Sequence, residues 1–320
     1  MHALVVARHD RFDGLEYSEV PEPRPEPGEI SIDVQVAGVG LIDALWTTGA
    51  MPSLSGFIPG LEVSGTVREL GEDVTGFTLG QRVAAILPAA GGFAEIVCAP
   101  AALVAVIPDG VGTDVAAVVP VNTVTAHLAL TTVARFTPGE SLLVHAGVGG
   151  LGSQFAQVAK ALGAGRIDAV VGTAAKQETA AALGYDHAYL RSDLTAVPED
   201  TYDIVVDPVG GEATRTAFGL MRSGGRLLRV GNASQAPDVP VSSIDHWLQN
   251  KTTAGFNVGA WLAAHPKAGT DSLAWALTAV ARGDIRVDLT ETAEFPRVTD
   301  LLAALEQGRT TGKVAIRIRG

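Results

Sequence analysis

The chain has 320 residues, of which 47% are hydrophobic and 18% charged, so it can bury the cores of two domains, and general disorder is excluded. Its net charge of −12 and its aromatic content of 5% exclude a general nucleic-acid binder. A single cysteine, Cys98, excludes an intrachain disulfide framework and Cys-rich zinc sites.

Apolar runs in the sequence are too short for a signal-peptide core or for a membrane-spanning helix. We therefore expect a soluble, cytoplasmic protein that has no membrane partner.

The first third of the chain is expected to be rich in β-strands. A proline- and glutamate-rich link at 21–29 precedes a run at 30–36 in which Ile30, Ile32 and Val34 alternate with polar residues, as in a half-buried strand. Strand-like runs follow at 61–67, 80–87 and 93–98, with glycine turns between them. Short strands without a long helix predict a compact β-barrel domain.

From about residue 113 the pattern changes to an alternation of strands and helices. A helix is expected at 124–133, and apolar runs at 141–145, 166–171, 203–207 and 226–230 alternate with helical patterns. This alternation predicts a parallel, doubly wound sheet, so the fold class is α/β. Helices near 271–281 and 297–307 and a final strand at 313–319 complete the chain.

The most informative motif is a glycine turn, His145-Ala-Gly-Val-Gly-Gly-Leu-Gly152. Gly147, Gly149 and Gly152 have the spacing of a dinucleotide-binding turn, with a hydrophobic strand before it and an amphipathic helix after it. Glycine lets the backbone approach a pyrophosphate, which the free N–H groups at the helix N-terminus bind. The turn therefore predicts a dinucleotide site that includes Val148, Gly150 and Leu151.

The identity of the dinucleotide depends on residues about 20 positions later, where an NAD site places Asp or Glu. This chain has Gly172 there, followed by Thr173 and Lys176. The absent carboxylate leaves room for a 2′-phosphate, to which Thr173 can donate a hydrogen bond and Lys176 offers a positive charge. We expect NADP(H) as the cofactor; the alternative for Lys176 is a solvated lysine at a helix start.

A series of motifs across essentially the whole chain carries a family resemblance. They are Gly40-Leu-Ile-Asp43, Pro59-Gly-Leu-Glu-Val-Ser-Gly65, the Gly71 to Val83 segment, Asn122-Thr-Val-Thr-Ala126, the glycine turn, Asp207-Pro-Val-Gly210, Gly231-Asn-Ala-Ser234 and Arg309-Thr-Thr-Gly-Lys313. In these the chain resembles the medium-chain dehydrogenase/reductase superfamily, specifically its zinc-free quinone oxidoreductase (zeta-crystallin-like) branch. The resemblance implies a GroES-like β-barrel domain, 1–117 with 256–320, and a Rossmann domain, 118–255, which binds NADP(H).

The same resemblance implies further cofactor contacts. Asn122, Thr125, Phe256 and Asn257 would lie near the nicotinamide half, and Arg309 would reach the 2′-phosphate. The residues that end a strand at the carboxyl edge of the sheet, where ligands of such sheets bind, are Gly231, Asn232 and Ala233.

The chain departs from the zinc-dependent members of this superfamily. Gly40 or Leu41 stands where those members have Cys, and Leu61 stands where they have His. Catalytic zinc needs three protein ligands, so we expect no metal. Cys98 is expected to be a small core residue, and His145 a packed core residue with its hydrogen bonds satisfied.

The expected function is metal-free hydride transfer from NADPH to a quinone or an α,β-unsaturated carbonyl. The substrate-pocket candidates are Asp43, Trp46, Met51 and Trp261, and no catalytic residue can be named; a solvated turn residue is the alternative for Asp43. Two other functions stay open: a biosynthetic enoyl or enone reductase, and a non-catalytic NADPH-binding sensor. A homodimer is expected from the resemblance and from the unpaired outer strand of a Rossmann sheet.

Overall fold

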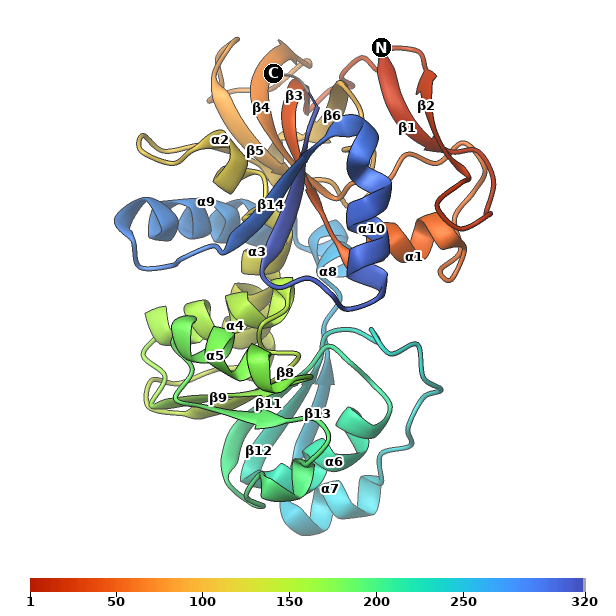
Figure 1. Cartoon of the computed structure of the whole chain (residues 1–320). Coiled ribbons are helices and arrows are strands. Elements are labelled where there is room, and N and C mark those ends of the chain that lie inside the picture. The colour runs from red at the N-terminus through yellow and green to blue at the C-terminus, as the bar shows by residue number, and fades with distance from the viewer. Residues whose placement is uncertain (319–320) are drawn as a thin grey trace. The chain divides into compact units, whose positions relative to one another are not determined.

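The computed structural model describes residues 1–318 and divides into two compact units (Figure 1). The first contains Met1–Val124 and the described residues from Leu262 onward, and the second is Thr125–Trp261. The boundaries fall within two helices, α3 (Pro120–Leu128) and α8 (Val258–Ala264), a few residues after the expected divisions at 117/118 and 255/256.

The second unit is built on a six-stranded sheet of order β10-β9-β8-β11-β12-β13 in which every pair is parallel. This is the expected Rossmann order, and it reverses between β8 and β11. Figure 1 shows α4 and α5 on one side of the sheet and α6 and α7 on the other. The strands are β8 (Ser141–His145), β9 (Arg166–Val171), β10 (His187–Leu190), β11 (Tyr202–Asp207), β12 (Met221–Arg229) and β13 (Thr252–Gly255), and the helices are α4 (Gly150–Ala161), α5 (Ala174–Ala182), α6 (Glu212–Leu220) and α7 (Ser243–Gln249).

Burial explains why the central strands form. All six residues of β11 are buried, and so are the last four of β8, because helices cover both faces of the sheet. The helix expected at 124–133 is present as the end of α3 followed by a π-helical segment, Ala129–Ala134.

The first unit is a β domain that the C-terminal part of the chain completes, as a GroES-like barrel requires. Its seven-stranded sheet has the order β14-β15-β3-β4-β5-β7, and β6 also pairs with β3. The strands are β1 (His2–Val6), β2 (Leu15–Glu19), β3 (Glu29–Val39), β4 (Glu62–Leu70), β5 (Arg82–Ile86), β6 (Ile96–Pro100), β7 (Val104–Val106), β14 (Leu289–Glu294) and β15 (Lys313–Arg317), and the helices are α1 (Leu41–Thr48), α2 (Thr113–Ala116), α9 (Pro266–Arg282) and α10 (Val298–Glu306). The expected end of the last strand, Arg319, lies outside the described residues.

A buried ion pair ties β15 to β4. Lys313 Nζ lies 2.6 Å from Glu62 Oε1, and both side chains are 3% exposed. Glu62 Oε2 accepts a hydrogen bond of 2.7 Å from the backbone N–H of Val121 at the start of α3. The pair therefore joins the C-terminal segment to the barrel and to the helix that leads into the second unit.

β3 is more deeply buried than a half-exposed strand. Ser31 is 2% exposed and the apolar residues Ile30, Ile32 and Val34 belong to the core of the first unit. β3 pairs with β4, β6 and β15, so it is a central strand. Among residues 1–318, every helix is too short or too polar to cross a lipid bilayer.

Candidate functional site

The glycine turn follows β8, and its positions require glycine for different steric reasons. A Cβ at Gly147 would lie 2.7 Å from the Cβ of Ala169, and one at Gly152 would lie 2.4 Å from the carbonyl oxygen of Ala146. A Cβ at Gly149 would meet only that same oxygen, at 3.2 Å. Packing within the protein therefore requires glycine at 147 and 152, whereas Gly149 mainly leaves the N-terminus of α4 open.

The N-terminus of α4 is suited to an anion. Gly149 is the N-cap of this helix and no side chain in residues 1–318 caps it, so the first amide groups need another partner. Val148 is buried, and Gly150 and Leu151 are half-buried. A pyrophosphate at this position would accept from these amides and would face the positive end of the helix dipole.

A residue that the sequence did not reveal lies behind the turn. The hydroxyl of Tyr185 is 2.8 Å from the carbonyl oxygen of Gly147 and 2.9 Å from that of Gly152, and it donates to them. Burial raises the pKa of this phenol, so it stays protonated. No sequence pattern marks Tyr185, which lies more than 30 residues from the turn along the chain.

Positive charge gathers beyond the end of β9. Gly172 follows this strand, Thr173 is the N-cap of α5 and Lys176 lies in its first turn. The guanidinium of Arg191, a second residue that the sequence analysis missed, would be 3.9 Å from a Cβ at Gly172. Burial and the charge of Arg191 both lower the pKa of Lys176, and Arg191 forms none of the ion pairs found within residues 1–318. An anion would relieve the repulsion between these two cations.

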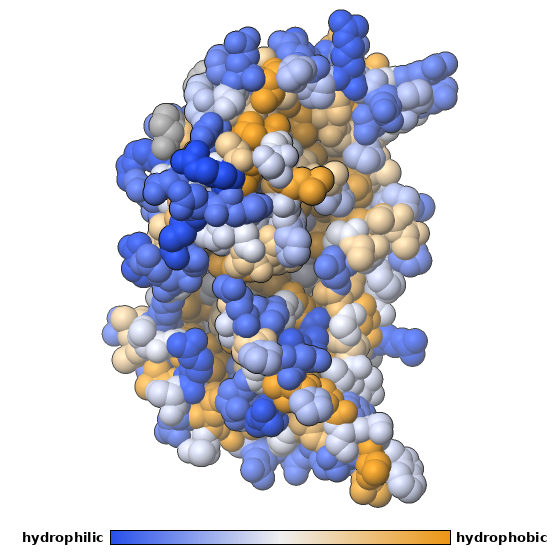
Figure 2. Space-filling view, turned by 90° about the vertical axis from the view of Figure 1, so that its right-hand side faces the viewer, coloured by the Kyte–Doolittle hydropathy of each residue, from blue (hydrophilic) through white to orange (hydrophobic). Residues whose placement is uncertain are grey.

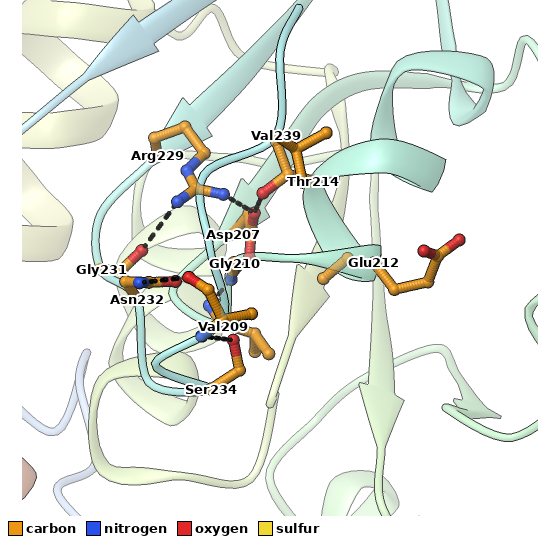
Figure 3. Close-up of polar contacts among 12 residues, drawn as sticks. Asp207, Val209, Gly210, Glu212, Thr214, Arg229, Gly231, Asn232, Ser234 and Val239 are labelled. Carbon is orange, nitrogen blue, oxygen red and sulfur yellow. Dashed lines mark hydrogen bonds and ion pairs between the residues drawn. The ribbon is translucent and has the colours of Figure 1, made fainter.

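A buried aspartate organises the loops on the other side of the switch point (Figure 3). Asp207 Oδ1 accepts hydrogen bonds from the N–H groups of Val209 and Gly210, at 2.8 and 2.9 Å. Asp207 Oδ2 accepts from the Thr214 hydroxyl at 2.6 Å and from Arg229 Nη1 at 2.7 Å. One fully buried carboxylate thus fixes the ends of β11 and β12 and the first turn of α6.

The loop after β12 carries Gly231, Asn232 and Ala233 and is held against the loop after β11. The N–H groups of Ala233 and Ser234 donate to the carbonyls of Pro208 and Val209, at 3.0 and 2.9 Å. Within the loop, Arg229 Nη2 donates to the carbonyl of Gly231 at 3.3 Å (Figure 3). A Cβ at Gly210, whose φ is +83°, would lie 1.9 Å from Asn232 Oδ1. Glycine is therefore required at 210 for the two loops to meet.

His145, directly before the glycine turn, is buried as expected, but its hydrogen bonds are not all satisfied. Its Nε2 has no hydrogen-bond partner among the described residues, so the side chain is not fully satisfied. Burial lowers its pKa to about 4, although the charge of Asp207 opposes this shift. The imidazole is thus neutral near pH 7.

The residues expected near the nicotinamide lie where the chain passes between the units. Asn122 and Thr125 are on α3, and Thr125 is 5% exposed. Phe256 is buried, and Asn257 Oδ1 accepts from the N–H of Ala260 at 3.0 Å, which caps the first turn of α8. Phe256 and Asn257 lie between the end of β13 and the start of α8.

The substrate-pocket candidates have varied surroundings. Asp43 is 1% exposed, and its oxygens accept from the N–H groups of Gly40 at 2.8 Å and Gly60 at 2.9 Å, so it is not a solvated turn residue. Burial raises its pKa to about 6. The ring of Trp46 packs edge-on against Phe57, with centroids 5.1 Å apart. The remaining two are Met51, which is partly exposed, and Trp261, whose ring is 5.8 Å from that of Phe256.

Arg309 and Cys98 lie in the first unit. Arg309 follows α10, and its Nε donates to Gln307 Oε1 at 2.8 Å. Cys98 is half-buried in β6 rather than a core residue, and burial raises its pKa to about 11. In the part of the chain that the structure describes, no group of three or more His, Cys, Asp or Glu side chains is placed to hold a metal ion.

Known proteins match both units. Residues 26–109 match the family of alcohol dehydrogenase GroES-like domains, and residues 150–275 match that of zinc-binding dehydrogenases. A mycobacterial structure in complex with NADPH is 27% identical, with a TM-score of 0.87 and 99% of each chain covered. A quinone oxidoreductase from Pseudomonas syringae is 25% identical, with a TM-score of 0.89 and 99% of each chain covered.

Curated relatives are much longer than this chain. A phenolphthiocerol/phthiocerol polyketide synthase from Mycobacterium tuberculosis is 29% identical over 324 residues, which cover 98% of this chain but 15% of that protein. A polyketide synthase from Streptomyces halstedii is 38% identical over 215 residues, 66% of this chain and 4% of that protein.

Proposed function

Because this chain belongs to the medium-chain dehydrogenase/reductase family, we propose that it is an NADPH-dependent oxidoreductase that reduces a quinone or another α,β-unsaturated carbonyl without a metal. The observation that carries the proposal is the open N-terminus of α4, where no side chain of the described residues caps the helix and a Cβ at Gly149 would meet one protein atom, at 3.2 Å. The NADPH complex of the mycobacterial relative supports the choice of cofactor.

The chain's own residues fit the phosphates of such a cofactor. The amides of Gly150 and Leu151 would bind the pyrophosphate at the start of α4. Thr173, Lys176 and Arg191 would bind the 2′-phosphate, since this corner carries two cations and has Gly172 where an NAD site has a carboxylate.

Bound NADPH supplies a hydride from C4 of its nicotinamide, and with a proton this converts a quinone to a hydroquinone, or an enone to a saturated carbonyl, leaving NADP⁺. Asn122, Thr125, Phe256 and Asn257 would orient the nicotinamide half. Asp207 holds the loops after β11 and β12 in place. Conjugation already polarises the acceptor, so the protein needs to provide orientation and exclusion of water rather than a Lewis acid.

An alternative within the same chemistry is reduction of an enoyl thioester in a biosynthetic assembly. The observation that favours it is the match along 98% of this chain to a segment of a polyketide synthase. A non-catalytic NADPH sensor is the third candidate, because Gly40, Leu45 and Met51 offer few polar groups to a substrate.

One set of assays separates these functions. Purified protein is titrated with NADPH and NADH, and NADPH oxidation is then followed with 1,4-benzoquinone, with an aliphatic enone and with the crotonyl thioester of N-acetylcysteamine. We expect turnover of a quinone or the enone. Selective turnover of the thioester would favour the biosynthetic role, binding without turnover would favour the sensor, and the absence of NADPH binding would refute the proposal.

We also propose that the chain forms a homodimer through the β13 edge of its Rossmann sheet. β13 ends the strand order, and beside it α7 carries Ile244, Trp247 and Leu248, which are 62%, 76% and 63% exposed. Figure 2 shows hydrophobic residues at the surface at the level where α7 lies in Figure 1. An exposed apolar stripe beside the end strand of a sheet favours self-association. Light scattering at micromolar concentration tests this, and a monomer mass would refute it.

A further inference from the structure

A single phenol bridges the two ends of the glycine turn. Tyr185 follows the C-terminus of α5, after Gly184, whose φ is +90°. Its hydroxyl reaches the carbonyl of Gly147 at 2.8 Å and that of Gly152 at 2.9 Å. These are the first and third glycines of the turn, so one O–H group, shared between two acceptors, spans the segment that contains Gly149.

We propose that Tyr185 is a positioning residue for the cofactor: its hydroxyl fixes the carbonyls on both sides of Gly149 and thereby aims the amides of Gly150 and Leu151 at the pyrophosphate. The inference rests on the proposed NADPH-binding function. It assigns a role to a residue outside the glycine motif and outside the contacts expected with the cofactor.

The phenol and the turn fit each other closely. Tyr185 is 6% exposed, so water cannot readily replace its hydroxyl against the two carbonyls. A Cβ at Gly147 would lie 3.0 Å from the Tyr185 oxygen. The absence of a side chain at 147 therefore makes room both for the neighbouring strand and for this hydroxyl.

The helix that carries Lys176 is also held by a contact that is independent of the Tyr185 hydroxyl. α5 begins after Thr173 and carries Lys176, and Tyr185 lies just beyond its other end. Gln157 of α4 donates a hydrogen bond of 2.7 Å to the carbonyl of Leu183, the C-cap of α5. The end of α5 is thus held against both α4 and the turn, and the contact of Tyr185 is the one made directly to the glycines.

The test compares two tyrosine-to-phenylalanine variants in the same unit. Tyr185→Phe removes only the bridging oxygen. Tyr202→Phe is the matched control, because the Tyr202 hydroxyl is also buried and donates to Asp168 at 2.5 Å, with no contact to the turn. We expect Tyr185→Phe to raise the Kd for NADPH about tenfold, while Tyr202→Phe changes it less than about twofold.

A second ligand distinguishes positioning from general loosening of the unit. Adenosine 2′-monophosphate lacks the pyrophosphate, so its Kd should be the same in Tyr185→Phe and in the wild type. The rise in Tm that saturating NADPH produces is a further readout, which also works for a variant of low stability because the ligand binds the folded state. That rise should be smaller in Tyr185→Phe than in Tyr202→Phe.

The outcomes separate this inference from the function on which it rests. Wild-type protein that does not bind NADPH would refute the proposed function. If the wild type binds NADPH, the role of Tyr185 is overturned by an unchanged Kd in Tyr185→Phe, by an equal loss in both variants, or by an equal loss of affinity for adenosine 2′-monophosphate.

Discussion

Replacing Gly172 by aspartate should reverse the cofactor preference. The position accepts a side chain, because its φ lies outside the left-handed region and a Cβ would meet only the Arg191 guanidinium, at the ordinary contact distance of 3.9 Å. The new carboxylate would pair with Arg191 and repel a 2′-phosphate. It would also stand where NAD-binding sheets place an acidic acceptor for the ribose hydroxyl.

The magnitude follows from the charges at this corner. A hydrogen bond to a charged group contributes about 1.5–3 kcal/mol, so loss of the Arg191 contact together with repulsion between the new carboxylate and the 2′-phosphate costs about 3–6 kcal/mol. At about 1.4 kcal/mol per factor of ten, kcat/KM for NADPH should fall at least 100-fold.

Lys176→Ala, Arg191→Ala and Arg309→Ala should each raise the KM for NADPH and leave that for NADH nearly unchanged.

Steady-state kinetics with both cofactors provide the assay. Gly219→Asp, on the exposed side of α6 where a Cβ has open space, adds the same charge elsewhere in the unit and serves as the control. The NADPH preference of the wild type should weaken as salt is raised. The reasoning is refuted if wild type uses NADH as efficiently as NADPH, or if Gly172→Asp and its control behave alike.

Four other outcomes are expected. Gly149→Ala or Gly149→Val should abolish NADPH binding in a fluorescence titration with little loss of stability, whereas Gly152→Ala should lower the Tm because its Cβ would be 2.4 Å from a carbonyl oxygen. Lys313→Met should cost about 3–5 kcal/mol in urea unfolding by leaving Glu62 buried and unpaired, and a loss below about 1 kcal/mol would contradict this. Asp43 has a pKa raised from 3.8 to about 6, so its contribution to stability falls as pH rises between these values. The gap in unfolding free energy between wild type and Asp43→Ala should therefore shrink by about 2 kcal/mol from pH 4 to 7. Elemental analysis should find no zinc retained after dialysis, and one zinc per chain would contradict the metal-free proposal.

The features that depend on residues close together in the chain could be predicted from the sequence alone. Strand, glycine turn and helix follow one another within about 20 residues, and each has its own local pattern, so β8, the turn and α4 could be predicted together. The same holds for Thr173 and Lys176, which follow β9 directly.

Residues brought in by tertiary packing were missed. Tyr185 and Arg191 follow α5 and β10, and only the parallel pairing of β10 with β9 places them beside the turn and Gly172. A tyrosine or an arginine at the end of an element has no local pattern that marks it. Burial of Asp43 was equally hidden, because its partner Gly60 lies 17 residues away.

The three glycines of the turn meet two different requirements: packing within the protein and access for a ligand. Gly147 must be small because β9 and the Tyr185 hydroxyl lie against it, and Gly152 because the backbone of Ala146 does. Either requirement exists in the protein alone, so selection for stability would keep both glycines even without a ligand. Gly149 differs, since the protein places one atom at 3.2 Å and otherwise leaves the helix N-terminus open. Gly149 is thus the position where the proposed pyrophosphate adds most to the requirement for glycine, and substitution there should separate binding from folding more cleanly than at either neighbour.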